Sequence, residues 1–172
     1  ASLGQGLLVH QAALLKEQGK SFEEVVRWTE ENKRNVHHWF TVDDLHHLRR
    51  GGRLSGAAAA LGTFIHIKPV LFFNDEGRLV LHEKVLGRTR SFRTLVDHFG
   101  EFLPDSGKTM IFLSHGDCPE DAQAVAGMIR ERFGVDVDRI NYLGPVTGTH
   151  SGPGTVALFF MGKSREASPQ KV

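Results

Sequence analysis

The sequence lacks several features that would indicate a secreted or membrane protein. It has a single cysteine, Cys118, so it cannot form an internal disulfide. No run reaches the roughly 18 consecutive apolar residues that a membrane-spanning helix requires. The first residues also lack the charged-then-apolar pattern of a secretory signal. From these absences we expect a cytoplasmic protein.

An excess of charge of one sign is missing too. The 172 residues include 21 lysines and arginines and 20 aspartates and glutamates, for a formal net charge of +1. This balance gives no electrostatic reason to expect nucleic acid as a partner. Any site for an anion must therefore be local. The length suits one ordinary domain, or one domain with part of another.

The motifs of common enzyme classes and metal sites are also absent. There is no Walker loop, no GxGxxG after a strand, no GxSxG, no CxxC and no HExxH. The adjacent pairs His37-His38 and His46-His47 point in different directions on a strand or helix, so neither forms a clamp. Cys118 lies near a helix start but lacks an evident base, which favours a structural or incidental role. The sequence therefore predicts no metal and no cofactor.

Hydrophobic periodicity predicts two helices at the start of the chain, over residues 3–18 and from Ser21 to about Asn35. The second opens with SFEE, in which Ser21 and Glu24 have the form of a capping box. Two helices and one strand are too little to enclose a core of their own. This segment resembles the end of a preceding unit.

The next elements are a strand and short helices. VHHWFTV, residues 36–42, is rich in β-branched and aromatic residues and predicts a strand. A short helix is expected to follow, capped by Thr41 and ended by Gly51. Ser55 then begins an alanine-rich segment that also suits a helix.

Antiparallel pairing is indicated by two strand-like runs on either side of residues 74–77, Asn-Asp-Glu-Gly, which predict a hairpin. Pro69 in the first run favours an edge position. Further on, Pro119 suits a first helical turn that Asp117 would cap. The later elements expected are helices at 91–103 and 119–133 and strands at 108–114, 137–142 and 155–161. The mixture predicts an α/β or α+β fold.

RRGGRLSG, residues 49–56, is the first candidate site. Gly51 and Gly52 remove side-chain obstruction, Ser55 offers a hydroxyl at a helix start, and the guanidinium of Arg53 can donate two hydrogen bonds to a carboxylate or phosphate. The alternative is a helix end followed by a helix start, with Arg53 merely exposed.

GPVTGTHSGPGT, residues 144–155, is the second candidate. We interpret it as a loop in which His150 could donate to an anion or relay a proton. A simple turn explains it equally well. SHGD, residues 114–117, is a third and weaker candidate, because a cap by Asp117 explains it without assigning His115 to a site.

The phenylalanines fit either a protein core or the lining of an apolar cavity. The sequence leaves both open for Phe64, Phe72, Phe73, Phe99, Phe112, Phe159 and Phe160.

SLGQGLLV, DDLHHLRRGGRLS, IHIKPVLFF, SHGD and GPVTGTHSGPGT occur in the order and approximate spacing of the DegV family. The sequence resembles this family, also known as the fatty-acid-binding subunits of bacterial fatty acid kinase, over nearly its whole length. The resemblance implies a C-terminal α+β domain with a mixed, largely antiparallel sheet and flanking helices. The last elements of a Rossmann-like N-terminal domain would precede it.

The same resemblance implies a function. A member of this family is expected to hold a long-chain fatty acid such as palmitate or oleate in an apolar tunnel, without catalytic residues of its own. It would present the carboxylate to an ATP-dependent kinase subunit, with transient membrane contact allowed. The family motifs assign the carboxylate to Arg53 and His150. Gly52, Ser55, Gly148 and Thr149, from the same motifs, complete the predicted binding set.

Most of the N-terminal domain of the family has no counterpart in the sequence, which resembles a C-terminal fragment. Residues 1–47 would be the remnant of the Rossmann-like domain, residues 48–163 the C-terminal domain, and residues 164–172 a mobile polar tail.

The segment KVLGRTR departs from the family pattern, in which an arginine usually follows Lys-Val. Leu86 occupies that position here. If the arginine helps to dock the kinase, then Arg88 or Arg90 must substitute or the coupling must differ.

Two other function classes remain open from the residues alone. One is an enzyme acting on a phosphorylated or carboxylated small molecule, with His150 as general acid or base. The other is an interaction domain in which the glycine-rich segments only turn the chain.

Overall fold

The structure is a computed structural model that describes residues 2–53 and 66–164. The helices are α1 (Ser2–Glu17), α2 (Phe22–Asn32), the 3-10 helix η1 (Lys33–Asn35), α3 (Leu45–Arg50), α4 (Arg88–Phe102), α5 (Pro119–Phe133) and α6 (Pro145–Ser151). The strands are β1 (Val36–Thr41), β2 (Ile67–Phe73), β3 (Leu79–Leu86), β4 (Ile111–His115), β5 (Arg139–Tyr142) and β6 (Val156–Met161). The segment expected to be helical from Ser55 and the tail beyond Ser164 lie outside the described residues.

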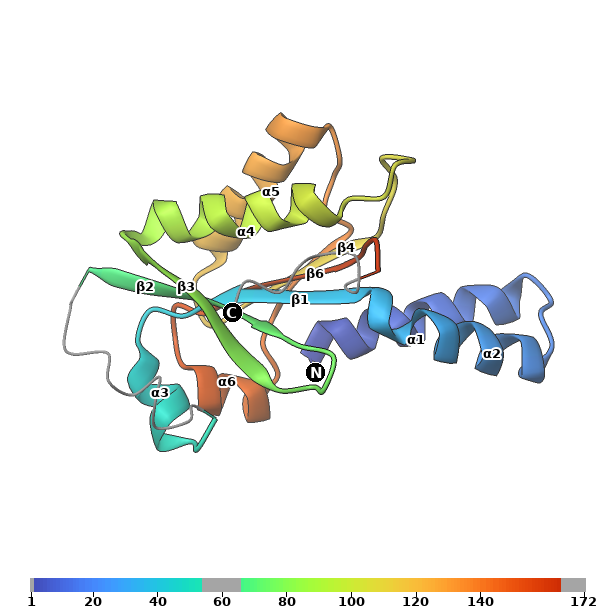
Figure 1. The fold of residues 1–172 in the computed structure, drawn as a ribbon, viewed down its shortest axis with the longest axis horizontal. Coiled ribbons are helices and arrows are strands. Elements are labelled where there is room, and N and C mark those ends of the chain that lie inside the picture. The colour runs from blue at the N-terminus through green and yellow to red at the C-terminus, as the bar shows by residue number, and fades with distance from the viewer. Residues whose placement is uncertain (1, 54–65, 165–172) are drawn as a thin grey trace.

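The strands form one six-stranded sheet in the order β3-β2-β1-β6-β4-β5. Neighbouring strands run antiparallel, except that β4 and β5 run parallel. Figure 1 shows α4 and α5 on one face of this sheet, with α1, α3 and α6 on the other. The mixed, largely antiparallel sheet with flanking helices confirms the predicted fold class.

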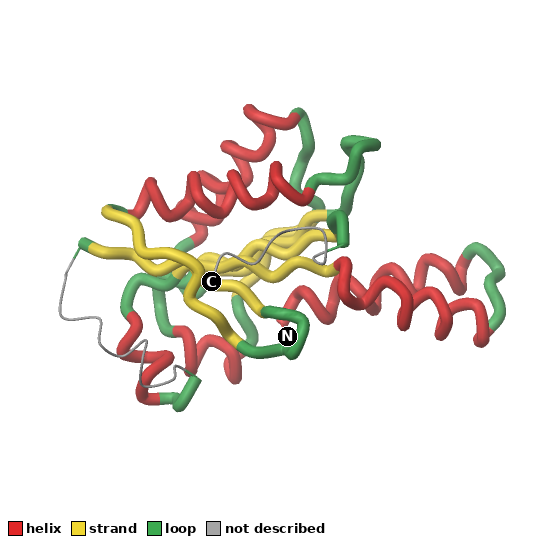
Figure 2. Tube along the Cα trace, viewed as in Figure 1, coloured by secondary structure: helices red, strands yellow, loops and turns green. Residues whose placement is uncertain are grey.

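β1 lies in the middle of the sheet (Figure 2). Trp39 pairs with Phe72 of β2 on one side and with Leu158 of β6 on the other. A domain boundary between residues 47 and 48 would therefore separate a central strand from both its neighbours, and β1 belongs with the later segment. That α1 and α2 are the remnant of a preceding domain stays a prediction, although Leu7 of α1 is fully buried against this sheet.

The alternation of side chains along the strands divides the core into two clusters. In β4, Ile111 and Leu113 face the cluster under α4 and α5, whereas Phe112 faces the cluster on the opposite side. Phe72, Phe99 and Phe160 belong to or pack on the first cluster, and Phe73, Phe112 and Phe159 on the second. Phe64 lies outside the described residues.

Several local predictions are confirmed. Ser21 and Glu24 form the capping box of α2, with reciprocal bonds of 3.2 Å and 2.8 Å. Pro119 occupies the first turn of α5. The hairpin turn also forms as expected, since Gly77 has a φ of 73° and donates its N–H to the carbonyl of Asn74.

Other local predictions are wrong. Thr41 ends β1 and does not cap α3, which begins only at Leu45. The residue preceding α5 is Cys118, not Asp117, and it makes no side-chain cap. Asp117 instead takes a left-handed conformation with a φ of 54°. That conformation makes the sharp turn out of β4, so the side chain is not placed at the helix start.

Pro69 does not mark an edge strand, because β2 lies between β3 and β1. Its pairing with β1, however, extends only as far as Val70. Pro69 therefore lies one residue beyond the point where β1 would require an N–H donor, and the strand remains internal without losing that bond.

Leu158 provides a test of the core, because it is fully buried in β6 near the centre of the sheet. We expect Leu158→Ala to lower the free energy of unfolding by about 2–5 kcal/mol, since it removes buried methyl groups and leaves a cavity. Leu86→Ala is the control, because Leu86 is 74% exposed, and should change it by less than about 0.5 kcal/mol. Urea denaturation followed by circular dichroism measures both, and similar losses would contradict this placement.

Candidate functional site

The turn formed by Gly51, Gly52 and Arg53, here called the GGR turn, ends α3 with two backbone hydrogen bonds. The N–H of Gly52 donates to the carbonyl of Arg49 at 3.0 Å, and the N–H of Arg53 donates to that of Leu48 at 2.9 Å. Gly52 has a φ of 66°, the left-handed conformation that this kind of helix end requires. Gly52 therefore stops the helix, one residue later than predicted. The turn folds Arg53 back, so that its Nη1 donates to the carbonyl of Gly51 at 2.6 Å.

The segment GPVTGTHSGPGT is not a loop throughout, because Pro145–Ser151 forms α6. Proline at the first position suits a helix start, and Gly152 ends the helix with a φ of 81°. His150 thus lies in the last helical turn. Its position is set by helix geometry, not by a flexible connection.

The polar groups of Gly148 and Thr149 form hydrogen bonds that stabilise α6. The N–H of Gly148 donates to the carbonyl of Gly144 at 2.9 Å. The hydroxyl of Thr149 donates to the carbonyl of Pro145 at 2.7 Å. Their assignment as ligand-binding residues stays a prediction.

The two segments interlock through two glycines. A Cβ added to Gly51 would lie 2.4 Å from Nδ1 of His150, and one added to Gly152 would lie 2.5 Å from the ring of His47. Each helix thus places a histidine ring against a glycine of the other. The consequence is that Arg53 and His150, nearly a hundred residues apart, both contact Gly51.

Both side chains keep hydrogen-bonding capacity. Within residues 2–53 and 66–164, the only hydrogen bond of the Arg53 side chain goes to Gly51, and none involves the ring of His150. Arg53 is exposed and His150 is half-buried. A guanidinium and an imidazole placed in this way can together bind an anionic group. Ser55 lies outside the described residues.

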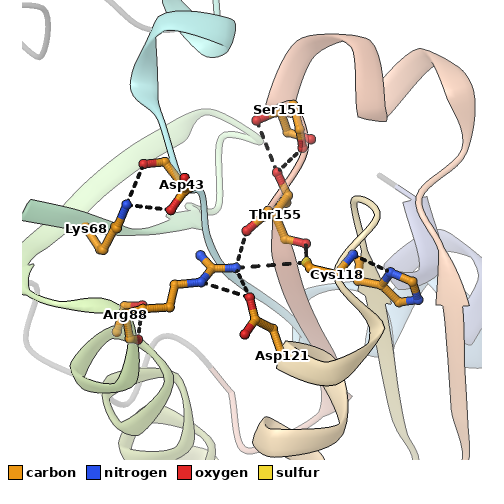
Figure 3. A network of polar contacts seen from close by, with 11 residues as sticks. Asp43, Lys68, Arg88, Cys118, Asp121, Ser151 and Thr155 are labelled. Atoms are coloured by element: carbon orange, nitrogen blue, oxygen red, sulfur yellow. Dashed lines mark hydrogen bonds and ion pairs between the residues drawn. The ribbon is translucent and has the colours of Figure 1, made fainter. Parts of the chain in front are cut away.

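A second polar network holds the turn after α6 (Figure 3). The N–H of Gly116 donates to the carbonyl of Thr155 at 2.8 Å, and the N–H of Gly154 donates to that of Gly116 at 2.7 Å. The Thr155 hydroxyl donates to the carbonyl of Gly152 at 2.8 Å. The two backbone bonds of Gly116 join the SHGD segment to the GPGT segment, which the sequence places far apart.

Arg88 is the charged centre of this network. Its Nη2 donates to the carbonyl of Gly154 and to Oδ2 of Asp121, the latter at 2.8 Å. Sequence reasoning did not assign Arg88 this structural role, for which only the acidic first turn of α5 gave a signal. Arg88 is thus held inside the fold, whereas Arg90 is exposed.

The surroundings of His115 and Cys118 indicate that both residues support the fold. His115 is buried and its Nδ1 accepts from the N–H of Cys118 at 3.3 Å. Burial raises the pKa of the Cys118 thiol, and neighbouring Arg88 offsets this only in part. The pKa therefore shifts opposite to the direction required for a reactive thiolate, in agreement with a structural role.

Ser114 in the same segment was missed by the sequence analysis. Its Oγ is buried and has no hydrogen-bond partner within the described ranges. Strand alternation places it on the face of Phe112, where α3 and α6 also lie. It adds an unsatisfied polar group on the side of the sheet that carries Arg53 and His150.

A substitution at Gly51 tests the close packing between the GGR turn and α6. We expect Gly51→Ala to lower the free energy of unfolding by about 1–3 kcal/mol, because the new methyl group collides with the His150 ring. Gly148→Ala is the matched control, since its Cβ would meet nothing closer than 3.9 Å. In a helix interior it should be neutral or stabilise by up to about 1 kcal/mol. Chemical denaturation distinguishes them, and a stable Gly51→Ala variant would argue against close packing.

Cys118 gives a test of the second network. Because its thiol has a raised pKa, the thiolate fraction at pH 8 is smaller than in the unfolded chain. We expect iodoacetamide to alkylate the native protein several-fold more slowly than the guanidinium-unfolded protein, with a rate that climbs further as the pH increases. Equal rates at pH 8 would contradict this environment.

Comparisons with known proteins identify the family of this chain. A family model described as an uncharacterised protein of the DegV family matches residues 1–163. A DegV domain-containing protein of Clostridium perfringens is 47% identical over 166 residues, which cover 96% of this chain and 57% of that protein. The chain thus spans little more than half the length of this relative.

Solved structures give the same result. A fatty-acid-binding DegV protein of Streptococcus agalactiae is 32% identical with a TM-score of 0.81, over 93% of this chain and 56% of its own. A DegV protein of Thermus thermophilus with fatty acid binding is 30% identical with a TM-score of 0.83, over 94% and 58%. In the described part of the chain, none of the helices has the length and apolar character that crossing a bilayer requires. On the family match and these relatives, the chain belongs to the DegV family.

Proposed function

We propose that this protein binds a long-chain fatty acid such as palmitate or oleate, and that Arg53 and His150 hold its carboxylate. The observation that carries the proposal is the convergence of these two side chains on Gly51. Two relatives of known structure that are at least 30% identical bind fatty acids. Their similarity covers 93% and 94% of this chain.

The chemistry of the two side chains suits a carboxylate. Burying a carboxylate at the end of an apolar site is costly unless a charge and several donors compensate it. Arg53 supplies a positive charge and a forked donor, and His150 supplies a further N–H. The absence of a side chain at Gly52 leaves room beside Arg53, while Ser55, Gly148 and Thr149 remain proposed neighbours of the head group.

The protein would act as a carrier and not as an enzyme. In this proposal it stays in the cytoplasm and presents the carboxylate to a separate ATP-dependent kinase, which forms the acyl phosphate. Arg90 is exposed in the first turn of α4, four residues after Leu86, and is the proposed contact for that kinase. Residues of the relatives that have no counterpart in this chain would complete the binding site.

Arg53 and Arg50 provide a matched test, because both are exposed and only Arg53 turns back to Gly51. Arg50 instead directs Nη2 toward Nδ1 of His47 at 3.4 Å. We expect Arg53→Ala to weaken oleate binding by about tenfold to a hundredfold, the range for loss of a charge-assisted hydrogen bond. Arg50→Ala should change it little. Titration of the delipidated full-length protein with oleate measures both, and equal effects would contradict the proposed site.

Mass spectrometry of the purified full-length protein provides an independent check. A co-purifying fatty acid, or uptake of added palmitate, is the expected result. If neither is found while the protein is folded, the proposal of a fatty-acid carrier is wrong.

A further inference from the structure

A β-bulge in the β2–β3 hairpin changes which residues of β3 face α4. Val70 pairs with Glu83, but the next residue, Leu71, pairs with Leu81, so His82 is inserted between the two pairs. Leu81 packs on the cluster opposite α4, whereas Val85 belongs to the cluster beneath α4. In a regular strand, residues four apart would share a face. The bulge breaks this rule and directs both His82 and Glu83 to the α4 side.

His98 on α4 meets these two residues. One ligand atom from each of His82, Glu83 and His98 lies within 4.8 Å of the others. The rings of His82 and His98 are 4.5 Å apart between centroids and nearly perpendicular, at 88°. Two imidazoles and a carboxylate therefore converge from an edge strand and the helix that covers it.

The His98 ring is already held in one orientation. It stacks on the indole of Trp39, with centroids 3.8 Å apart and an interplanar angle of 10°. Its Nδ1 lies 3.1 Å from Oε2 of Glu101. A carboxylate at Nδ1 favours the proton there, which leaves the lone pair on Nε2. Histidine ligands of metal ions are commonly oriented by such a carboxylate.

We propose that His82, Glu83 and His98 bind a divalent transition-metal ion, with Zn²⁺ as the best match. Imidazole nitrogens and a carboxylate oxygen suit Zn²⁺, Ni²⁺ or Cu²⁺, while a hard cation such as Mg²⁺ prefers oxygen ligands throughout. Three protein ligands leave a coordination position for water. The sequence predicts no metal because no single element carries a metal-binding motif, whereas this cluster joins two elements.

The site allows the movement and the access that an ion needs. Bonds of about 2.0–2.2 Å to the ion require the donors to approach to about 3.5 Å. His82 and Glu83 are exposed on the edge strand β3 and can close this gap around the half-buried His98. The bound ion would link β3 to α4 and stabilise the folded protein. This inference does not depend on the proposed fatty-acid function.

Isothermal titration of the chelator-treated full-length protein with zinc chloride at pH 7.5 tests the proposal. We expect one ion per chain. His82→Gln and Glu83→Gln should each weaken binding at least about tenfold, and Glu101→Gln about tenfold through the orientation of His98. His10→Gln is the control, because His10 on α1 lies beside Phe112 on the other side of the sheet, and should bind zinc as the unchanged protein does.

Fluorescence of Trp39 provides a second readout in a Trp28→Phe background of this 172-residue chain, in which Trp39 is the remaining tryptophan. Added Ni²⁺ is expected to quench Trp39 because the His98 ring stacks on it, and His82→Gln should abolish most of the quenching. If His98→Gln destabilises the protein, the exposed His82 and Glu83 variants still decide the question. No zinc binding, or an equal loss in His10→Gln, would overturn the proposal.

Discussion

The contact between α3 and α6 determines where the candidate site lies. His150 packs on Gly51 and His47 packs on Gly152, with no space for a side chain at either glycine. This reciprocal packing fixes two segments that are distant in the sequence. It also places the only strong cation of the GGR turn beside the only histidine of α6. Without it, the exposed Arg53 would follow a short helix with no histidine of α6 packed on the same turn.

The second network supports this contact from the other side. Arg88 holds the carbonyl of Gly154, and the backbone of Gly116 exchanges hydrogen bonds with the same turn. The turn that follows α6 is therefore fastened to α4, to α5 through Asp121, and to the end of β4. Such over-determined backbone keeps His150 in place on a helix too short to be stable alone. A rigid frame around a binding group reduces the ordering cost when a ligand arrives.

Local signals explain which parts of the fold could be predicted. The capping box at Ser21, the turn at Gly77 and the start of α5 at Pro119 depend on neighbouring residues and are correct. Features that depend on tertiary partners were not accessible. α6 contains a glycine and begins with a proline, so its composition suggests a loop, and its helix is stabilised by packing against α3.

The candidate site also contains some features that local sequence signals predict and others that depend on tertiary contacts. Arg53 and His150 could be selected because glycine-rich segments flank them and because the family motifs match. The pairing of Arg88 with Asp121 could not be found, since the acidic first turn of α5 does not indicate which arginine it binds. The convergence of His82, Glu83 and His98 also depends on one inserted residue in a strand. Sequence periodicity cannot detect such an insertion before the pairing register is known.

The bulge has a further consequence for the behaviour of the protein at high concentration. β3 is the outermost strand on its side of the sheet, and its unsatisfied backbone groups could pair with an identical edge of another molecule. The inserted residue interrupts the regular spacing of those groups, and the charged side chains of Glu83 and Lys84 follow directly after it. The same irregularity that gathers two side chains beneath α4 thus makes this edge a poor template for intermolecular β-sheet and so protects against aggregation.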